Sequence, residues 1–77
     1  MGQQEILSKV RDKLTVGELP RTKYPMTWVG AGMGHFCAAC DTPVRTTDVE
    51  IECAPPSDPA VRFHSECFRT WEKERLQ

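Results

Sequence analysis

Residues 37–67 decide the fold, and they read CAACDTPVRTTDVEIECAPPSDPAVRFHSEC. The stretch opens on a Cys-x-x-Cys pair, Cys37 and Cys40. It closes on a His-x-x-Cys pair, His64 and Cys67, with 23 residues between the two pairs. Zinc prefers four ligands in a tetrahedron, and thiolate sulfur and imidazole nitrogen are its usual structural donors. The two pairs therefore predict a structural Zn2+ site with these four side chains as ligands.

The spacing within each pair suits a metal site. A Cys-x-x-Cys on a tight turn, a zinc knuckle, brings two sulfurs onto one ion. His64 and Cys67 are three positions apart, so at the first turn of a helix their side chains point the same way. The positive end of the helix dipole also stabilises a thiolate there. A chain of 77 residues benefits from such a crosslink, because short chains bury little apolar surface.

Two further side chains compete as ligands. Cys53 in place of His64 would give a four-cysteine site, which also suits zinc. Cys53 shares a predicted strand face with Val49 and Ile51, however, and this favours a role as a small core residue. His35 lies two residues before Cys37 in a glycine-rich loop and is a candidate ligand as well.

Two strands are predicted between the pairs. Residues 49–53 alternate apolar and acidic side chains, which is the pattern of a half-buried strand. Residues 60–63 are a second candidate strand. Residues 54–59 join them and contain three prolines, so they form a loop. Together these segments predict an antiparallel hairpin.

Helices are predicted at both ends of the chain. In residues 5–14, Leu7, Val10 and Leu14 recur on one face, and Gly17 is a plausible stop. A core-facing stripe is the expected role of that face, with partner binding as the alternative. Residues 65–76 form the closing helix, with Phe68 and Trp71 on the same face as the last ligand pair.

The segment between the first helix and the knuckle is predicted to be irregular. Residues 21–29 form an extended arm because they contain proline and no helical period. Trp28 and Val29 are expected to anchor this arm in the core. Residues 30–34 are rich in glycine, but a Cys-x-x-Cys follows them where a phosphate-binding loop would open a helix. We therefore expect a flexible approach to the metal site.

These elements make an α+β fold in one domain, residues 1–77. Residues 1–34 supply the N-terminal helix and the arm, and residues 35–77 supply the knuckle, the hairpin and the C-terminal helix. The predicted core consists of Ile6, Leu7, Val10, Leu14, Trp28, Val49, Ile51, Phe63, Phe68 and Trp71.

The cysteines could instead form two disulfides. The first 14 residues are charged and lack the apolar run of a secretory signal. We therefore expect a reducing cytoplasmic location, where cysteine clusters more often bind metal. No segment reaches the roughly 20 apolar residues that a membrane span requires. The formal net charge of −1 is also unlike that of a strongly DNA-binding protein.

The motif CAAC at 37–40, taken with FHSECF at 63–68, resembles the first zinc module of a LIM domain and, more broadly, a treble-clef finger. That resemblance covers less than half of the chain and implies ligand roles for the four residues of the two pairs. A LIM domain continues at once into a second zinc module, whereas residues 69–71 contain no cysteine, so LIM partners do not carry over. The whole layout is also similar to small bacterial zinc-finger proteins, which implies no particular activity.

The sequence favours a non-enzymatic function. Four protein ligands leave zinc no open position for a catalytic water. We expect a structural-zinc protein that acts as an interaction module with another protein as partner. One alternative is a nucleic-acid-binding finger that uses basic side chains, namely Arg21, Lys23, Arg45, Arg62, Arg69, Lys73 and Arg75. The other alternative is a thiol redox or metal sensor, because zinc-bound thiolates can be oxidised. The oligomeric state is not predicted.

Overall fold

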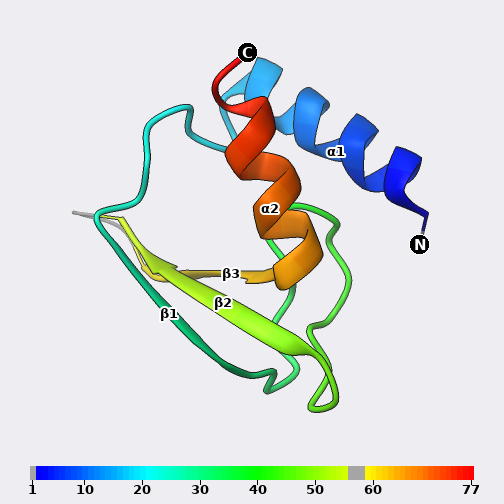
Figure 1. Ribbon diagram of the computed structural model, residues 1–77, viewed down its shortest axis with the longest axis vertical. Coiled ribbons are helices and arrows are strands. Elements are labelled where there is room, and N and C mark those ends of the chain that lie inside the picture. The colour runs from blue at the N-terminus through cyan, green and yellow to red at the C-terminus, as the bar shows by residue number, and fades with distance from the viewer. Residues whose placement is uncertain (1, 56–58) are drawn as a thin grey trace.

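The structure is a computed structural model that describes residues 2–55 and 59–77. It confirms the predicted α+β layout, with a small antiparallel sheet and a helix at each end of the chain (Figure 1). The elements in chain order are α1 (Gln3–Val16), β1 (Met26–Ala31), β2 (Val49–Ala54), β3 (Val61–His64) and α2 (Ser65–Glu74). Neither described helix combines the length and the apolar character that crossing a bilayer requires.

Helix α1 buries one apolar stripe, as its sequence predicts. Ile6, Val10 and Leu14 are buried at successive i, i+4 positions, which lie on one helix face. The helix ends at Gly17, whose φ of 83° is left-handed and whose backbone N–H donates to the carbonyl of Leu14. Glycine adopts this conformation without steric cost, so it is a good helix stop.

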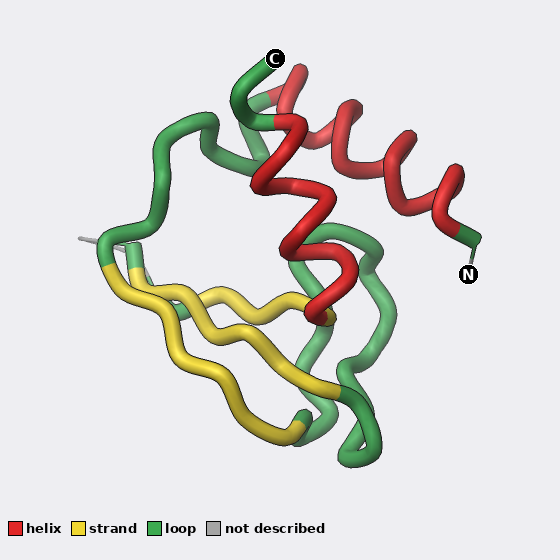
Figure 2. The backbone as a smooth tube through the Cα atoms, in the orientation of Figure 1, coloured by secondary structure: helices red, strands yellow, loops and turns green. Residues whose placement is uncertain are grey.

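The sheet has the strand order β1-β2-β3, and both pairings are antiparallel. The predicted hairpin is confirmed as β2 and β3, with Ile51 opposite Phe63. Part of its predicted proline loop, residues 56–58, lies outside the described residues. The tube in Figure 2 shows the long loop that returns from β1 to β2, and this loop carries the knuckle.

Part of the predicted extended arm is in fact a strand, β1. The prediction that Trp28 and Val29 anchor the arm in the core is wrong. Trp28 is 48% exposed and Val29 is 73% exposed. Helix α2 packs on β2 and β3, whereas β1 is the outer strand and neither helix packs on it (Figure 1). Val49, the β2 partner of Ala31, is also half exposed for this reason, so Trp28 and Val49 do not belong to the core.

The core lies where α1, α2 and the sheet meet. Of the predicted members, six are buried, whereas Leu7 and Phe68 are partly buried. The sequence analysis missed Leu19, Tyr24, Ala39 and Val44, which are all buried. The buried predicted members are Ile6, Val10, Leu14, Ile51, Phe63 and Trp71.

An aromatic cluster fixes α2 on the sheet. Phe63 of β3 and Trp71 of α2 lie 5.8 Å apart between ring centroids, and Tyr24 lies 5.0 Å from Trp71. The indole Nε1–H of Trp71 donates to the carbonyl of Pro20 at 2.8 Å. The segment after α1 is thereby held against α2, which explains why the core includes Tyr24.

The glycine-rich segment is not simply flexible. Gly30 belongs to β1, but Gly32 is buried at a close backbone crossing. A Cβ on Gly32 would lie 2.1 Å from the carbonyl oxygen of Arg45 and 2.6 Å from that of Val44. The absence of a side chain at this position therefore lets the chain after β1 pass close to the backbone of Val44 and Arg45.

Candidate metal centre

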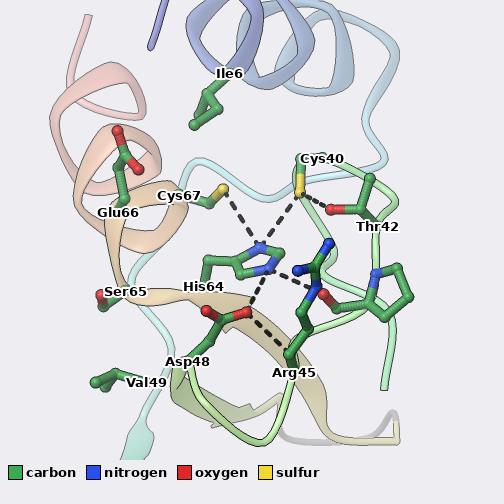
Figure 3. A pocket seen from close by; sticks show the side chains of 11 residues that line it. Ile6, Cys40, Thr42, Arg45, Asp48, Val49, His64, Ser65, Glu66 and Cys67 are labelled. Carbon is green, nitrogen blue, oxygen red and sulfur yellow. Dashed lines mark hydrogen bonds and ion pairs between the residues drawn. The ribbon is translucent and has the colours of Figure 1, made fainter. Parts of the chain in front are cut away.

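Four side chains from distant parts of the chain converge on one point. Their ligand atoms, three cysteine sulfurs and an imidazole nitrogen, all lie within 4.8 Å of one another. Cys37, Cys40 and Cys67 are buried and His64 is partly buried. Figure 3 shows His64 with its ring directed at the sulfurs of Cys40 and Cys67. This group could hold a metal ion.

The knuckle, residues 37–40, is a tight turn closed by its own backbone. The N–H of Asp41 donates to the carbonyl of Cys37 at 3.0 Å, and the N–H of Cys37 donates to the carbonyl of Thr42 at 2.9 Å. Asp41 has a left-handed φ of 64°, a conformation that aspartate tolerates better than most residues. The turn thus presents both knuckle sulfurs to the same side.

The second pair sits where β3 passes directly into α2. His64 is the last residue of β3 and the N-cap of α2, and Cys67 lies in the first helical turn. The knuckle pairs with the outer edge of β3, because the N–H of Ala38 donates to the carbonyl of Arg62 at 2.7 Å. The sheet therefore brings the two predicted pairs together.

The ring of His64 is oriented for ligation through Nδ1. Nδ1 lies 3.3 Å from the sulfur of Cys40 and 3.9 Å from that of Cys67. Nε2 lies 3.1 Å from the carbonyl oxygen of Pro43 and 3.7 Å from a carboxylate oxygen of Asp48. A carbonyl only accepts hydrogen bonds, so this contact places the proton on Nε2 and leaves the Nδ1 lone pair facing the sulfurs. Histidine ligands of metals are usually oriented in this way.

Hydrogen bonds to sulfur favour thiolates at the knuckle. The backbone N–H of His64 donates to the sulfur of Cys37 at 3.4 Å. The hydroxyl of Thr42 lies 3.0 Å from the sulfur of Cys40, where it can donate to a thiolate. Such contacts surround metal-bound thiolates and tune their charge.

The sulfurs of Cys37 and Cys67 influence each other's pKa. The hydrogen bond from the Cys67 thiol, aided by backbone donors, lowers the pKa of Cys37 to about 4. The same bond, together with burial, raises the pKa of Cys67. A divalent cation among the sulfurs would stabilise the thiolate form of both residues.

Two lysines of α1 donate hydrogen bonds to backbone carbonyls of the knuckle. Lys9 Nζ donates to the carbonyl of Cys40 at 3.1 Å, and Lys13 Nζ donates to the carbonyl of Ala38 at 2.8 Å. Lys13 also forms an ion pair with Asp41. The sequence analysis missed these contacts, although the i, i+4 spacing of the lysines already placed them on one face of the helix.

The competing ligands do not join the group. Cys53 is fully buried on β2, and burial, followed by the nearby charges of Glu72 and Glu52, raises its pKa to about 12. His35 is exposed, with Nδ1 3.9 Å from a carboxylate oxygen of Glu50. The described residues thus bring together the four predicted side chains and leave both alternatives outside.

A surface pocket of about 340 Å³ opens beside the centre (Figure 3). Its polar lining includes Arg45, Asp48 and Glu66. The backbone N–H of Arg45 donates to the Asp48 carboxylate at 3.0 Å, which helps to fix the loop beside the imidazole. Three of the four converging residues, Cys40, His64 and Cys67, also line this pocket.

Comparison with known proteins gives no match: no family model fits the chain, and neither a curated protein nor a solved structure is significantly similar to it. Functional inference therefore depends on the site itself.

Proposed function

We propose that the protein is a structural-zinc protein whose metal-stabilised surface acts as an interaction module. The observation that carries the proposal is the closed set of three sulfurs and one imidazole nitrogen within 4.8 Å of one another. Four protein ligands complete a tetrahedral zinc shell, which suits a structural ion better than a catalytic one. The free energy of metal binding then contributes to folding, because the site does not exist in the unfolded chain. A closed shell of this kind supports a non-enzymatic role for the ion.

The donor chemistry favours zinc among the common divalent ions. Calcium and magnesium take oxygen ligands, whereas this group offers sulfur and nitrogen. Tetrahedral sites with three thiolates and one imidazole are typical of Zn2+. The imidazole tautomer and the hydrogen bonds to sulfur support the same assignment.

Exposed apolar side chains support the interaction role. They lie on both faces of β1, at the start of β2 and on the loop that follows β1. The exposed members of this surface are Met26, Trp28, Val29, Met33, Phe36 and Val49. Some basic residues named for nucleic-acid binding are instead paired: Arg62 lies 3.9 Å from Glu52, and Arg75 lies 2.7 Å from Glu72.

Cysteine variants test the zinc proposal. Cys40→Ser and Cys67→Ser are expected to lose stoichiometric zinc and cooperative unfolding, as measured by elemental analysis and thermal denaturation. Cys53→Ser is the matched control, because it removes an equally buried thiol outside the group, and it is expected to retain one zinc ion per chain. If Cys53→Ser lost the metal while His64→Ala kept it, the ligand set would be wrong.

A further inference from the structure

The two edges of the sheet differ. The outer edge of β3 pairs with the knuckle, through Ala38 and the bridge between Cys37 and Arg62. The outer edge of β1 pairs with no strand of the described residues, and it faces away from both helices (Figure 1). An open edge presents a row of backbone donors and acceptors that can pair with another strand.

The pairing of β1 with β2 shows which backbone groups point outward. Gly32 continues the β1–β2 register opposite Asp48, and its N–H donates to the carbonyl of Asp48 at 3.0 Å. Hydrogen-bonded pairs alternate along an antiparallel ladder. The even-numbered residues of β1 therefore bond to β2, and the free N–H and C=O groups belong to Thr27, Val29 and Ala31.

These outward groups allow one symmetric pairing of β1 with the β1 strand of a second copy. A twofold axis at Val29 would place the two Val29 residues opposite each other as a hydrogen-bonded pair. Trp28 would then lie opposite Gly30 of the second copy. Met26 would lie opposite its Gly32. Large side chains thus face glycines across the junction, so an aromatic ring can cover a glycine that exposes its backbone.

The charge of the strand also favours a second copy as partner. Residues 24–34 contain no Asp, Glu, Lys or Arg, so two copies of β1 meet without like-charge repulsion. Natural edge strands usually carry a lysine or another charge that prevents such pairing. Val29 is 73% exposed, and it would lie beside Val29 of the second copy in the middle of a continuous sheet.

From these observations we infer that the protein forms a symmetric homodimer by antiparallel pairing of β1 with β1 of a second copy. The inference rests on the proposed function in one respect: it names a second copy of the chain as the partner of the proposed interaction surface. Six residues a side are fewer than the roughly 20–30 of a standard interface, so the dimer is weak and depends on concentration. A twofold contact is closed, so assembly stops at two chains.

Sedimentation of the zinc-loaded protein over a wide concentration range tests the dimer. The molecular mass of the wild type is expected to rise with protein concentration from that of one chain to that of two chains, and not beyond. Val29→Lys is expected to raise the dissociation constant roughly tenfold or more, because two charges would meet at the axis. Val16→Lys is the matched control, since Val16 is 69% exposed on α1, and it is expected to dimerise like the wild type.

Disulfide trapping tests the register. Opposed residues of a hydrogen-bonded pair have Cα atoms about 5.5 Å apart, within reach of a disulfide. Val29→Cys is therefore expected to crosslink two chains under mild oxidation. Thr27→Cys is the control, because the two copies of residue 27 would lie about 13 Å apart at 3.3 Å per residue.

Zinc content measured on the same samples separates this inference from the zinc proposal. A zinc-bound, folded protein that stays monomeric at every concentration would overturn the β1 pairing and leave the edge for an extended segment of another protein. Equal crosslinking of the two cysteine variants would overturn the register. A zinc-free dimer that Val29→Lys dissociates would support the pairing and contradict the zinc proposal.

Discussion

His64 shows how much one residue of this small protein does. It ends β3, caps α2 and directs Nδ1 at two sulfurs, while its backbone N–H donates to a third. The carbonyl of Pro43 sets the tautomer by accepting from Nε2. Strand, helix and candidate metal centre therefore share one residue.

Lys13 should stabilise the knuckle from α1. Lys13→Met keeps the aliphatic stem but removes the donor to Ala38 and the ion pair with Asp41. We expect a loss of about 1–2 kcal/mol in unfolding free energy, because a partly buried carbonyl loses a charged donor. Chemical denaturation of the zinc-bound protein measures it. Lys73→Met, at an exposed position of α2, should change stability little, and equal losses in both variants would contradict the proposed role.

Alkaline pH should destabilise the protein through Cys53 and Tyr24. Burial raises the pKa of the Cys53 thiol from 9.0 to about 12 and that of Tyr24 from 10.0 to about 12. Above pH 9 the unfolded chain releases the Cys53 proton while the folded chain retains it, so the unfolding free energy falls as pH rises from about 9 to 12. Denaturation across that range should show a shallower fall for Cys53→Ala. A slope identical to that of the wild type would contradict this account.

The four residues that converge at the candidate metal centre were predictable because their signal is local. Each pair is three positions apart, and that spacing determines its geometry whatever surrounds it. The core role of Cys53 followed in the same way from strand alternation. The lysine contacts and the Pro43 carbonyl could not be predicted, because they depend on how α1 and the loop after the knuckle lie against residues distant in the chain.

At the scale of elements, Gly32 determines how β1 connects to the metal centre. Gly32→Ala would place a methyl group 2.1 Å from the carbonyl oxygen of Arg45. The backbone must shift, and we expect a loss of about 1–3 kcal/mol in unfolding free energy. Thermal denaturation measures this effect.

Gly30→Ala is the control for Gly32→Ala. A Cβ on Gly30 meets no atom within 4 Å, and a glycine within a strand is entropically unfavourable. The variant should therefore be as stable as the wild type or slightly more so. Destabilisation by both substitutions alike would show that the crossing at Gly32 is not the cause.

The elements divide into those with a local pattern and those without one. Helices α1 and α2 and the hairpin of β2 and β3 show clear periods of 3.6 or 2 residues, so they were predicted. Strand β1 shows neither, because MTWVGA has no alternation of polar and apolar residues. Trp28 was assigned to the core on its size alone, but it lies opposite Glu52, on the sheet face away from α2. The face that packs on α2 carries Ile51 and Phe63.

At the scale of the molecule, zinc removal should unfold the protein. The site connects the knuckle to α2, and few other contacts can replace it in so small a core. A chelator should abolish the helical circular dichroism signal and the cooperative transition, and added zinc should restore both. A chelated protein that still unfolds cooperatively at the same temperature would contradict the structural role of the ion.

The knuckle that covers β3 has a consequence for polymerisation. A sheet with one open edge can pair with only one other sheet, so its assembly stops at two chains. The knuckle covers β3 through backbone contacts. Without the knuckle, the same folded sheet would have two open edges, which permits end-to-end growth into fibres. The knuckle would thus act as a chain terminator.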